Sequence, residues 1–160
     1  MKEFEIKTRV QAYEHTSQLP PLYAQLLEEA RSALSSSYAP YSKFHVGAAV
    51  RMKNGKTLKG ANQENAAYPI CLCAERVALG NALTELPHGQ VIAMAITVQN
   101  DHHEVSAPAA PCGSCRQAIL EQEIKQNAPI KLILQGSIGK IYVINSAKEM
   151  LPLGFDGSYL

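Results

Sequence analysis

The chain has 160 residues, of which 46% are hydrophobic and 18% charged, and its formal net charge is +1. This size and composition predict one globular domain with a substantial core. A net charge so close to zero gives no sign of the basic face that a nucleic-acid partner requires. No apolar run approaches the roughly 20 residues that cross a bilayer, so no membrane partner is expected.

The N-terminal segment alternates charged residues with apolar or β-branched ones from Phe4 to Val10, which is the period of a strand. Residues 3–13 are therefore expected to form a strand or extended arm, or else a poorly fixed terminus. We assign residues 1–20 to an N-terminal extension and residues 21–160 to the main domain. The mixed start of the chain is unlike a signal peptide, which predicts a cytoplasmic protein.

Beyond this arm, apolar residues recur at helical spacing in some segments and in β-rich runs in others. The expected elements are a helix over residues 21–37, strands over 44–50 and 56–60, a helix over 74–86, a strand over 91–98, a helix over 112–127, strands over 131–134 and 140–144, and a short helix near 146–151. Asn54-Gly55 is typical of a two-residue hairpin turn. The order predicts an α/β layered sheet with some parallel pairing, because strand–helix–strand units connect parallel neighbours.

All four cysteines lie in two short motifs, Cys71-Leu72-Cys73-Ala74-Glu75-Arg76 and Pro111-Cys112-Gly113-Ser114-Cys115-Arg116. Each motif stands at the predicted start of a helix, where unpaired N–H groups favour thiolates. Cys112 and Cys115 are one helical turn apart, and Cys73 adds a third sulfur, a set typical of tetrahedral zinc. Three thiolates leave a fourth position for water, whose pKa zinc lowers toward ~7.

Glu75 follows Cys73 by two residues and could move the protons of that water. A ligand-x-Glu motif followed by Pro-Cys-x-x-Cys is the signature of zinc deaminases, in which the glutamate is the general acid and base. A glutamate in a first helical turn is otherwise a surface residue. Arg76 and Arg116 each adjoin a motif, and a guanidinium bonded to the sulfurs would offset the charge of three thiolates.

Cys71 leaves an alternative open, because four thiolates would close the shell of a purely structural, non-catalytic zinc module. That alternative gives Glu75 no role and does not account for the polar cluster Asn62-Gln63-Glu64-Asn65. We therefore expect Cys71 to be a small buried filler. Asp101-His102-His103-Glu104 also contains metal-ligand residue types, but we expect these side chains to form an exposed loop.

These motifs, together with Phe44 and Asn62-Gln63-Glu64 ahead of them, resemble the small homotetrameric zinc-dependent cytidine deaminases from about residue 38 onward. The resemblance implies a three-layer α/β/α fold with a mixed five-stranded sheet. It also implies one Zn²⁺ per subunit held by Cys73, Cys112 and Cys115, with Glu75 as the proton carrier. The implied reaction is hydrolytic deamination of cytidine and deoxycytidine to uridine and deoxyuridine plus ammonia, as in pyrimidine salvage.

The resemblance assigns the substrate-binding positions as well. It implies that Asn62 and Glu64 hold the ribose, that Phe44 lies beside the pyrimidine, and that backbone groups of Ala66 and Ala74 hold the base. Asparagine and glutamate carry the amide and carboxylate groups that hold sugar hydroxyls through directional hydrogen bonds.

Three further expectations follow from the resemblance. Phe155 matches an aromatic residue that enters a neighbouring subunit's site, which implies a homotetramer with shared active sites, and Arg76 is favoured as the arginine at the sulfurs. Blasticidin S deaminases share the Cys-Ala-Glu and Pro-Cys-Gly-x-Cys-Arg motifs, so another aminopyrimidine nucleoside is the alternative substrate. The first ~20 residues, His45 and the 101–107 loop depart from the family pattern.

Overall fold

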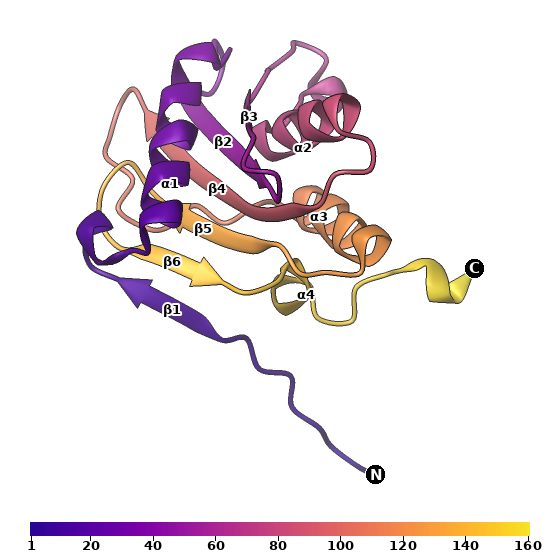
Figure 1. The fold of residues 1–160 in the computed structure, drawn as a ribbon. Coiled ribbons are helices and arrows are strands. Elements are labelled where there is room, and N and C mark those ends of the chain that lie inside the picture. The colour runs from indigo at the N-terminus through magenta and orange to yellow at the C-terminus, as the bar shows by residue number, and fades with distance from the viewer.

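A six-stranded mixed sheet forms the centre of the protein in the computed structural model, which describes residues 1–160. Its strands lie in the order β1-β6-β5-β4-β2-β3 (Figure 1). They are β1 (Val10–Tyr13), β2 (Phe44–Met52), β3 (Thr57–Ala61), β4 (Val91–Asn100), β5 (Lys131–Gln135) and β6 (Ile141–Ile144). Strands β4 and β5 pair in parallel, as their strand–helix–strand connection predicts, and all other neighbours are antiparallel.

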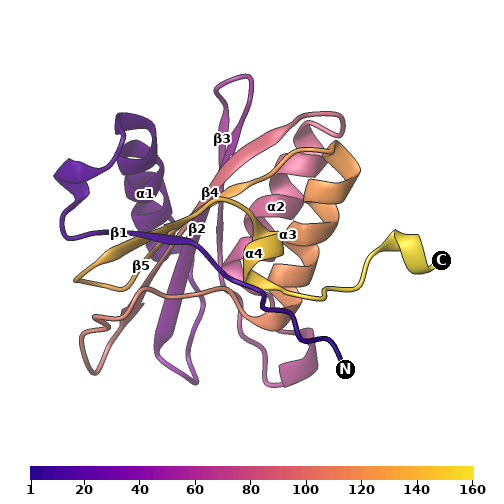
Figure 2. The same ribbon diagram turned by 90° about the horizontal axis from the view of Figure 1, so that it is seen from below.

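Helices cover both faces of this sheet. One face carries α1 (Pro21–Ala33), and the other carries α2 (Ala74–Glu85) and α3 (Gly113–Gln126), with the single-turn α4 (Ala147–Met150) beside α3 (Figure 2). Short 3₁₀ turns are η1 (Thr16–Gln18), η2 (Leu34–Ser36), η3 (Tyr68–Ile70) and η4 (Gly157–Tyr159). The predicted three-layer α/β/α arrangement is confirmed. None of these helices combines the length and the apolar character that crossing a membrane would need.

The sheet has one strand more than the five that we expected, because β1 pairs antiparallel with the edge of β6. Val10 lies opposite Ile144, and only the last four residues of the predicted arm are strand. Just ahead of β1, the Thr8 hydroxyl donates to the Glu149 carbonyl (2.6 Å) and the Arg9 N–H donates to the Glu149 carboxylate (3.1 Å). Sequence periodicity predicts such a strand but does not say whether a sheet edge is free to pair with it.

The β2–β3 turn contains three residues and not the expected two. The Met52 N–H donates to the Lys56 carbonyl (2.8 Å), and the Gly55 N–H donates to the Met52 carbonyl (3.0 Å). Gly55 has a φ of 91°, whereas Asn54 does not have a positive φ, which a two-residue type I′ turn would require at both positions. The Asn54 side chain instead accepts the Lys56 N–H (3.0 Å), which stabilises a type I turn ending on a left-handed glycine.

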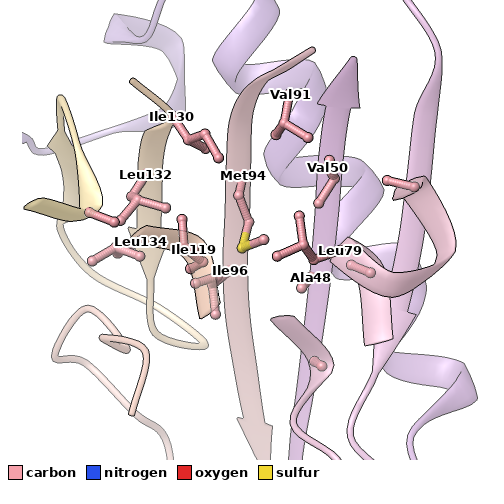
Figure 3. Packing of buried hydrophobic residues seen from close by; sticks show 14 of the residues in the cluster. Ala48, Val50, Leu79, Val91, Met94, Ile96, Ile119, Ile130, Leu132 and Leu134 are labelled. Carbon is pink, nitrogen blue, oxygen red and sulfur yellow. The ribbon is translucent and has the colours of Figure 1, made fainter. Parts of the chain in front are cut away.

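The hydrophobic core is divided by the sheet into two clusters. Leu132 and Leu134 of β5 belong to the cluster between the sheet and α2 and α3 (Figure 3). Ile133 between them packs in the other cluster, with residues of α1. Side chains alternate along a strand, so a strand buried on both faces is apolar at every position. Strand β4 behaves in the same way around Met94 and Ile96, which explains its long apolar run.

A close backbone contact sets the position of α2 against β3. A Cβ atom at Gly60 would lie 2.3 Å from the Ala78 nitrogen and 2.6 Å from the Ala74 carbonyl oxygen, so only glycine fits there. Ala74 is the first residue of α2 and follows Cys73 directly. This contact therefore also determines where the first cysteine motif meets the sheet.

We predict that Gly60→Ala lowers the free energy of unfolding by about 1–3 kcal/mol, because the methyl group has no space without a backbone shift. The control is Gly80→Ala in α2, the helix that Gly60 of β3 contacts, where an added Cβ meets nothing within 4 Å. That control should raise stability by up to about 1 kcal/mol through helix propensity. Urea titrations of both variants measure the difference, and equal stability of the two would contradict the contact.

Candidate active site

Three of the four cysteines meet where two helices begin. Cys73 immediately precedes α2, Cys112 immediately precedes α3, and Cys115 lies in the first turn of α3. The Sγ atoms of Cys73 and Cys112 are 3.9 Å apart, those of Cys112 and Cys115 are 3.6 Å apart, and all three lie within 4.8 Å of one another. Tetrahedral zinc with Zn–S bonds of 2.3 Å separates its sulfurs by about 3.8 Å, so these sulfurs fit one zinc ion.

The electrostatics of the three thiols also suit a bound cation. Burial, followed by the charges of Glu75 and Cys73, raises the pKa of Cys115 far above its usual value, and burial also raises the pKa of Cys73. Burial opposes ionisation of Cys112 too, but hydrogen bonds from Cys115 bring the pKa of Cys112 below its usual value. The surroundings thus oppose ionisation of Cys73 and Cys115, whereas a dication would stabilise all three thiolates.

Arg76 is the arginine that lies at the sulfurs. Its Nη2 is 3.7 Å from the Cys73 sulfur and donates to the Cys71 carbonyl at 3.2 Å. Arg116 instead donates through Nε to the Pro111 carbonyl (2.8 Å) and through Nη1 to the Met150 carbonyl (3.0 Å). Arg76, which the family resemblance favours over Arg116, is thus the arginine that lies beside a cysteine sulfur.

Cys71 lies outside the group of three sulfurs. Its Sγ accepts the Asn65 N–H at 3.2 Å and lies 3.6 Å from the Asn65 carbonyl oxygen. The side chain is half-buried, so the expectation of a simple buried filler was incomplete. Cys71 thus contacts the polar loop ahead of α2. Its sulfur does not join the other three, as the structural-zinc alternative would require.

A cavity of about 480 Å³ opens beside the sulfurs, a volume in the usual range for small-molecule sites. The predicted site residues that line it are Phe44, Asn62, Glu64, Cys73, Glu75 and Cys112. They come from β2, from the loop after β3 and from the starts of α2 and α3. The fold therefore brings residues as far apart in the sequence as Phe44 and Cys112, which are 68 positions apart, into one cavity.

Glu75 is the buried acid of this cavity. It lies in the first turn of α2 and is only 5% exposed. Burial raises the pKa of Glu75 above its usual value, and the nearby Arg76 only partly opposes this effect. A carboxyl group in such surroundings exchanges a proton more readily near neutral pH than an exposed one does.

Glu64 has the opposite surroundings. Its Oε2 accepts the backbone N–H groups of Tyr41 (2.9 Å) and Ser42 (3.3 Å), and its Oε1 accepts the Ser42 hydroxyl. The Ser42 hydroxyl bond is the main reason that the pKa of Glu64 is lowered. Glu64 is thus held as an anion on the cavity wall, with one lone-pair direction of Oε1 still free.

Asn62 is braced by the strands around it. Its Oδ1 accepts the Ser37 hydroxyl (2.6 Å) and the Val46 N–H (2.8 Å), and its Nδ2 donates to the Phe44 carbonyl (2.9 Å). His45 continues the network, because its Nδ1 lies 3.0 Å from the Ser37 hydroxyl. These contacts fix the orientation of the amide and leave one N–H of Nδ2 to donate to a ligand.

The other predicted site residues lie in different settings. Ala74 is fully buried between Cys73 and Glu75, whereas Ala66 lies in an exposed part of the loop before η3 and does not line the cavity. Phe155 is 57% exposed and stacks on Tyr159 with 5.4 Å between the ring centroids. It does not line the cavity of its own chain. The segment from Asp101 to Glu104 is exposed, as expected.

One wall of the cavity was not predicted from the sequence. It consists of small and apolar side chains that lead up to the second cysteine motif, namely Val105, Ala107, Pro108, Ala109 and Ala110. A signal existed in Pro108 and Pro111, because prolines interrupt a helix and the alanines between them carry no charge. No comparable sequence signal indicated Ser37 and Ser42, whose hydroxyls donate hydrogen bonds to Asn62 and Glu64.

A sequence profile described as the cytidine and deoxycytidylate deaminase zinc-binding region matches residues 22–128. The chain belongs to this deaminase family. It is 40% identical over 130 residues to the cytidine deaminase of Halalkalibacterium halodurans, which covers 81% of this chain and 91% of that protein. The predicted family and the enzyme class are thereby confirmed.

Solved structures lead to the same family. The crystal structure of cytidine deaminase from Burkholderia pseudomallei has a TM-score of 0.72 and 39% identity, and the match covers 82% of this chain and 97% of that chain. The enzyme from Mycobacterium tuberculosis has a TM-score of 0.65 and 30% identity, covering 84% and 97%. The predicted zinc cofactor is confirmed. The matched profile describes a zinc-binding region, and the sulfurs of Cys73, Cys112 and Cys115 lie close enough together to bind one ion.

We predict that Cys112→Ser abolishes stoichiometric zinc in the purified deaminase, because the remaining two thiolates cannot complete the shell. Cys71→Ala is the matched control and should retain the metal, since its sulfur lies outside the group of three. Elemental analysis by plasma mass spectrometry gives the zinc content per chain. Loss of zinc from the Cys71→Ala protein would show that the fourth sulfur is also a ligand.

Proposed function

We propose that this deaminase converts cytidine and deoxycytidine, with one water, into uridine and deoxyuridine plus ammonia. The single observation that carries the proposal is a buried glutamate, Glu75, in a nucleoside-sized cavity next to three converging sulfurs. The relatives named cytidine deaminase support this choice of substrate. Phe44, Asn62 and Glu64 support it further, because the cavity offers an aromatic ring and two groups suited to sugar hydroxyls.

We assign Cys73, Cys112 and Cys115 as the metal ligands and expect one zinc per subunit. When bound, zinc supplies a Lewis acid that makes hydroxide available near neutral pH. Arg76, with its guanidinium beside the Cys73 sulfur, partly neutralises the negative charge of three thiolates. The carboxyl group of Glu75 stays free for proton transfer, since the sulfurs supply the ligands.

Glu75 acts as the proton carrier in this mechanism. It takes a proton from the attacking water and delivers it to the ring nitrogen beside the amino-bearing carbon of the pyrimidine. After water oxygen has bonded to that carbon, Glu75 passes the second proton to the departing amine, and ammonia leaves. A carboxyl group whose pKa is raised by burial suits both steps, because it must accept and then release a proton.

The nucleoside is positioned by residues on both sides of the cavity. Glu64 offers its remaining acceptor position and Asn62 its remaining N–H donor to the sugar hydroxyls, while Phe44 lies beside the pyrimidine. Backbone groups of Ala74, at the start of α2, are assigned to the base, and so are those of Ala66, although Ala66 does not line the cavity of this chain. Hydrogen bonds to the substrate from groups that are already braced cost little reorganisation, which favours binding in one orientation.

We also propose that residues 21–160 form the catalytic domain and that residues 1–20 are an extension of it. The exposed Phe155 in the C-terminal tail supports a homotetramer, in which this ring enters the site of a neighbouring subunit. Leu153 nearby is 82% exposed, which also favours burial of the tail against another copy. Pyrimidine salvage in the cytoplasm is the setting that such a nucleoside reaction favours.

We predict that Glu75→Gln lowers kcat for cytidine by at least ~10²–10⁴-fold, because the amide cannot carry the proton. Loss of the cytosine absorbance gives the rate, and the variant should retain its zinc. Glu121→Gln, an exposed glutamate of α3, is the control and should leave the rate unchanged. Wild-type turnover of blasticidin S without turnover of cytidine or deoxycytidine would overturn the proposed substrate.

We predict that Glu64→Gln raises KM for cytidine by about 10- to 100-fold, because the site loses an anionic acceptor for the sugar. Inhibition by the product uridine should weaken by a similar factor. Steady-state kinetics measure both quantities, and Glu104→Gln in the exposed loop after β4 serves as the control. An unchanged KM would remove Glu64 from the sugar site.

A further inference from the structure

The arm of residues 2–10 has apolar side chains that nothing in this chain covers fully. Phe4 is 78% exposed, Ile6 50% and Val10 42%. The arm continues into β1, which is the edge strand of the sheet and pairs on one side only, with β6. Figures 1 and 2 show the arm leaving the sheet from β1 and running past α4 as an extended chain. Its outer edge therefore offers unpaired backbone groups.

The direction of these backbone groups follows from the contact with α4. The Arg9 N–H donates to the Glu149 carboxylate on the inner side of the arm at 3.1 Å. In an extended chain, successive residues direct their N–H and C=O groups to opposite edges. Thr8 and Val10 consequently direct theirs to the outer edge. An arm that stays extended through Lys2 would direct the groups of its other even-numbered residues the same way.

The charges of the arm are complementary to those of a second arm in the reverse direction. If two arms run antiparallel with Ile6 opposite Ile6, Glu5 lies opposite Lys7 and Glu3 lies opposite Arg9, and each pair occurs twice. A slip of the register by two positions places either two Glu5 or two Lys7 side chains opposite each other. A slip by one position puts charged residues on the apolar face. One register alone satisfies both the charges and the apolar side chains.

This register also agrees with the backbone. The pairs that exchange hydrogen bonds would be Ile6 with Ile6, Phe4 with Thr8 and Lys2 with Val10, all of them even-numbered residues with outward-facing groups. Within a single chain, Lys7 pairs with Glu5 at 3.0 Å, but these side chains are 83% and 77% exposed. An ion pair this exposed contributes little to the stability of the single chain. Exchanging it for the corresponding pairs between two arms therefore costs little.

We propose that the N-terminal arm is a self-association strand, through which two copies of this chain pair antiparallel about Ile6. The contact is isologous, because the same residues meet from both copies across a twofold axis. It lies outside the cavity and outside residues 22–128, which the family profile matches. The pairing is therefore independent of the proposed reaction and adds to any contact made by the C-terminal tail.

The first test uses charge reversal in the full-length protein. E5K places the new lysine opposite Lys7 and K7E places the new glutamate opposite Glu5, twice in each dimer, so each variant alone should associate at least about tenfold more weakly. An equimolar mixture of the two variants should regain the wild-type affinity, because every charged pair in the mixed dimer is again of opposite sign. Sedimentation velocity over a concentration series measures both, with a variant lacking residues 2–9 as the unpaired reference.

The second test is a crosslink across the proposed twofold axis. Hydrogen-bonded antiparallel partners have Cα atoms about 5.5 Å apart, within the range for a disulfide, so Ile6→Cys should form a covalent dimer with diamide. Phe4→Cys is the control on the same face, because it would lie roughly 13 Å from its counterpart. Wild-type protein treated with diamide in the same way shows how much crosslinking comes from the native cysteines.

The outcomes separate this proposal from the proposed function. An association constant that does not weaken when residues 2–9 are removed, no recovery in the E5K and K7E mixture, or equal crosslinking of Phe4→Cys and Ile6→Cys would each overturn the arm pairing. Turnover of cytidine should be the same in E5K, K7E and wild type. A wild-type protein without turnover but with arm pairing would count against the deaminase reaction alone.

Discussion

The site depends on the meeting of two helix N-termini over one face of the sheet. Cys73 and Cys112 are separated by 39 residues, yet their sulfurs lie 3.9 Å apart because α2 and α3 start side by side. The Gly60 contact sets α2 against β3, and α3 is held by its place in the β4–α3–β5 connection. Since zinc needs its sulfurs within a few tenths of an ångström of tetrahedral spacing, small packing shifts in this layer would reach the metal centre.

The cavity carries two carboxyl groups with opposite surroundings. Burial raises the pKa of Glu75, which favours proton transfer, whereas the Ser42 hydroxyl lowers the pKa of Glu64, which favours a permanent anion. In active sites, two acids whose surroundings shift their pKa values in opposite directions commonly differ in function. Arg76 lies on the sulfur side, with its Nη2 3.7 Å from the Cys73 sulfur.

Much of the fold and of the metal site could be predicted because the signals are local. Helical periodicity, β-rich runs and the Cys-x-Glu and Cys-x-x-Cys spacings each lie within a few residues, and the structure has the expected elements within a few positions. The pairing of β1 with the edge of the sheet, the three-residue turn at Gly55 and the contact between Cys71 and Asn65 were missed. Each depends on a partner elsewhere in the chain or on a local competition between hydrogen bonds, neither of which spacing reveals.

The sequence by itself determined the layered α/β class, the three candidate metal ligands and the glutamate beside them, because these follow from periodicity and residue chemistry. Only the tertiary structure decided which serines hold Asn62 and Glu64, and that residues between Val105 and Ala110 form a cavity wall. Such contacts join residues far apart along the chain. Their distances are set by how the helices pack on the sheet, and no single segment encodes that packing.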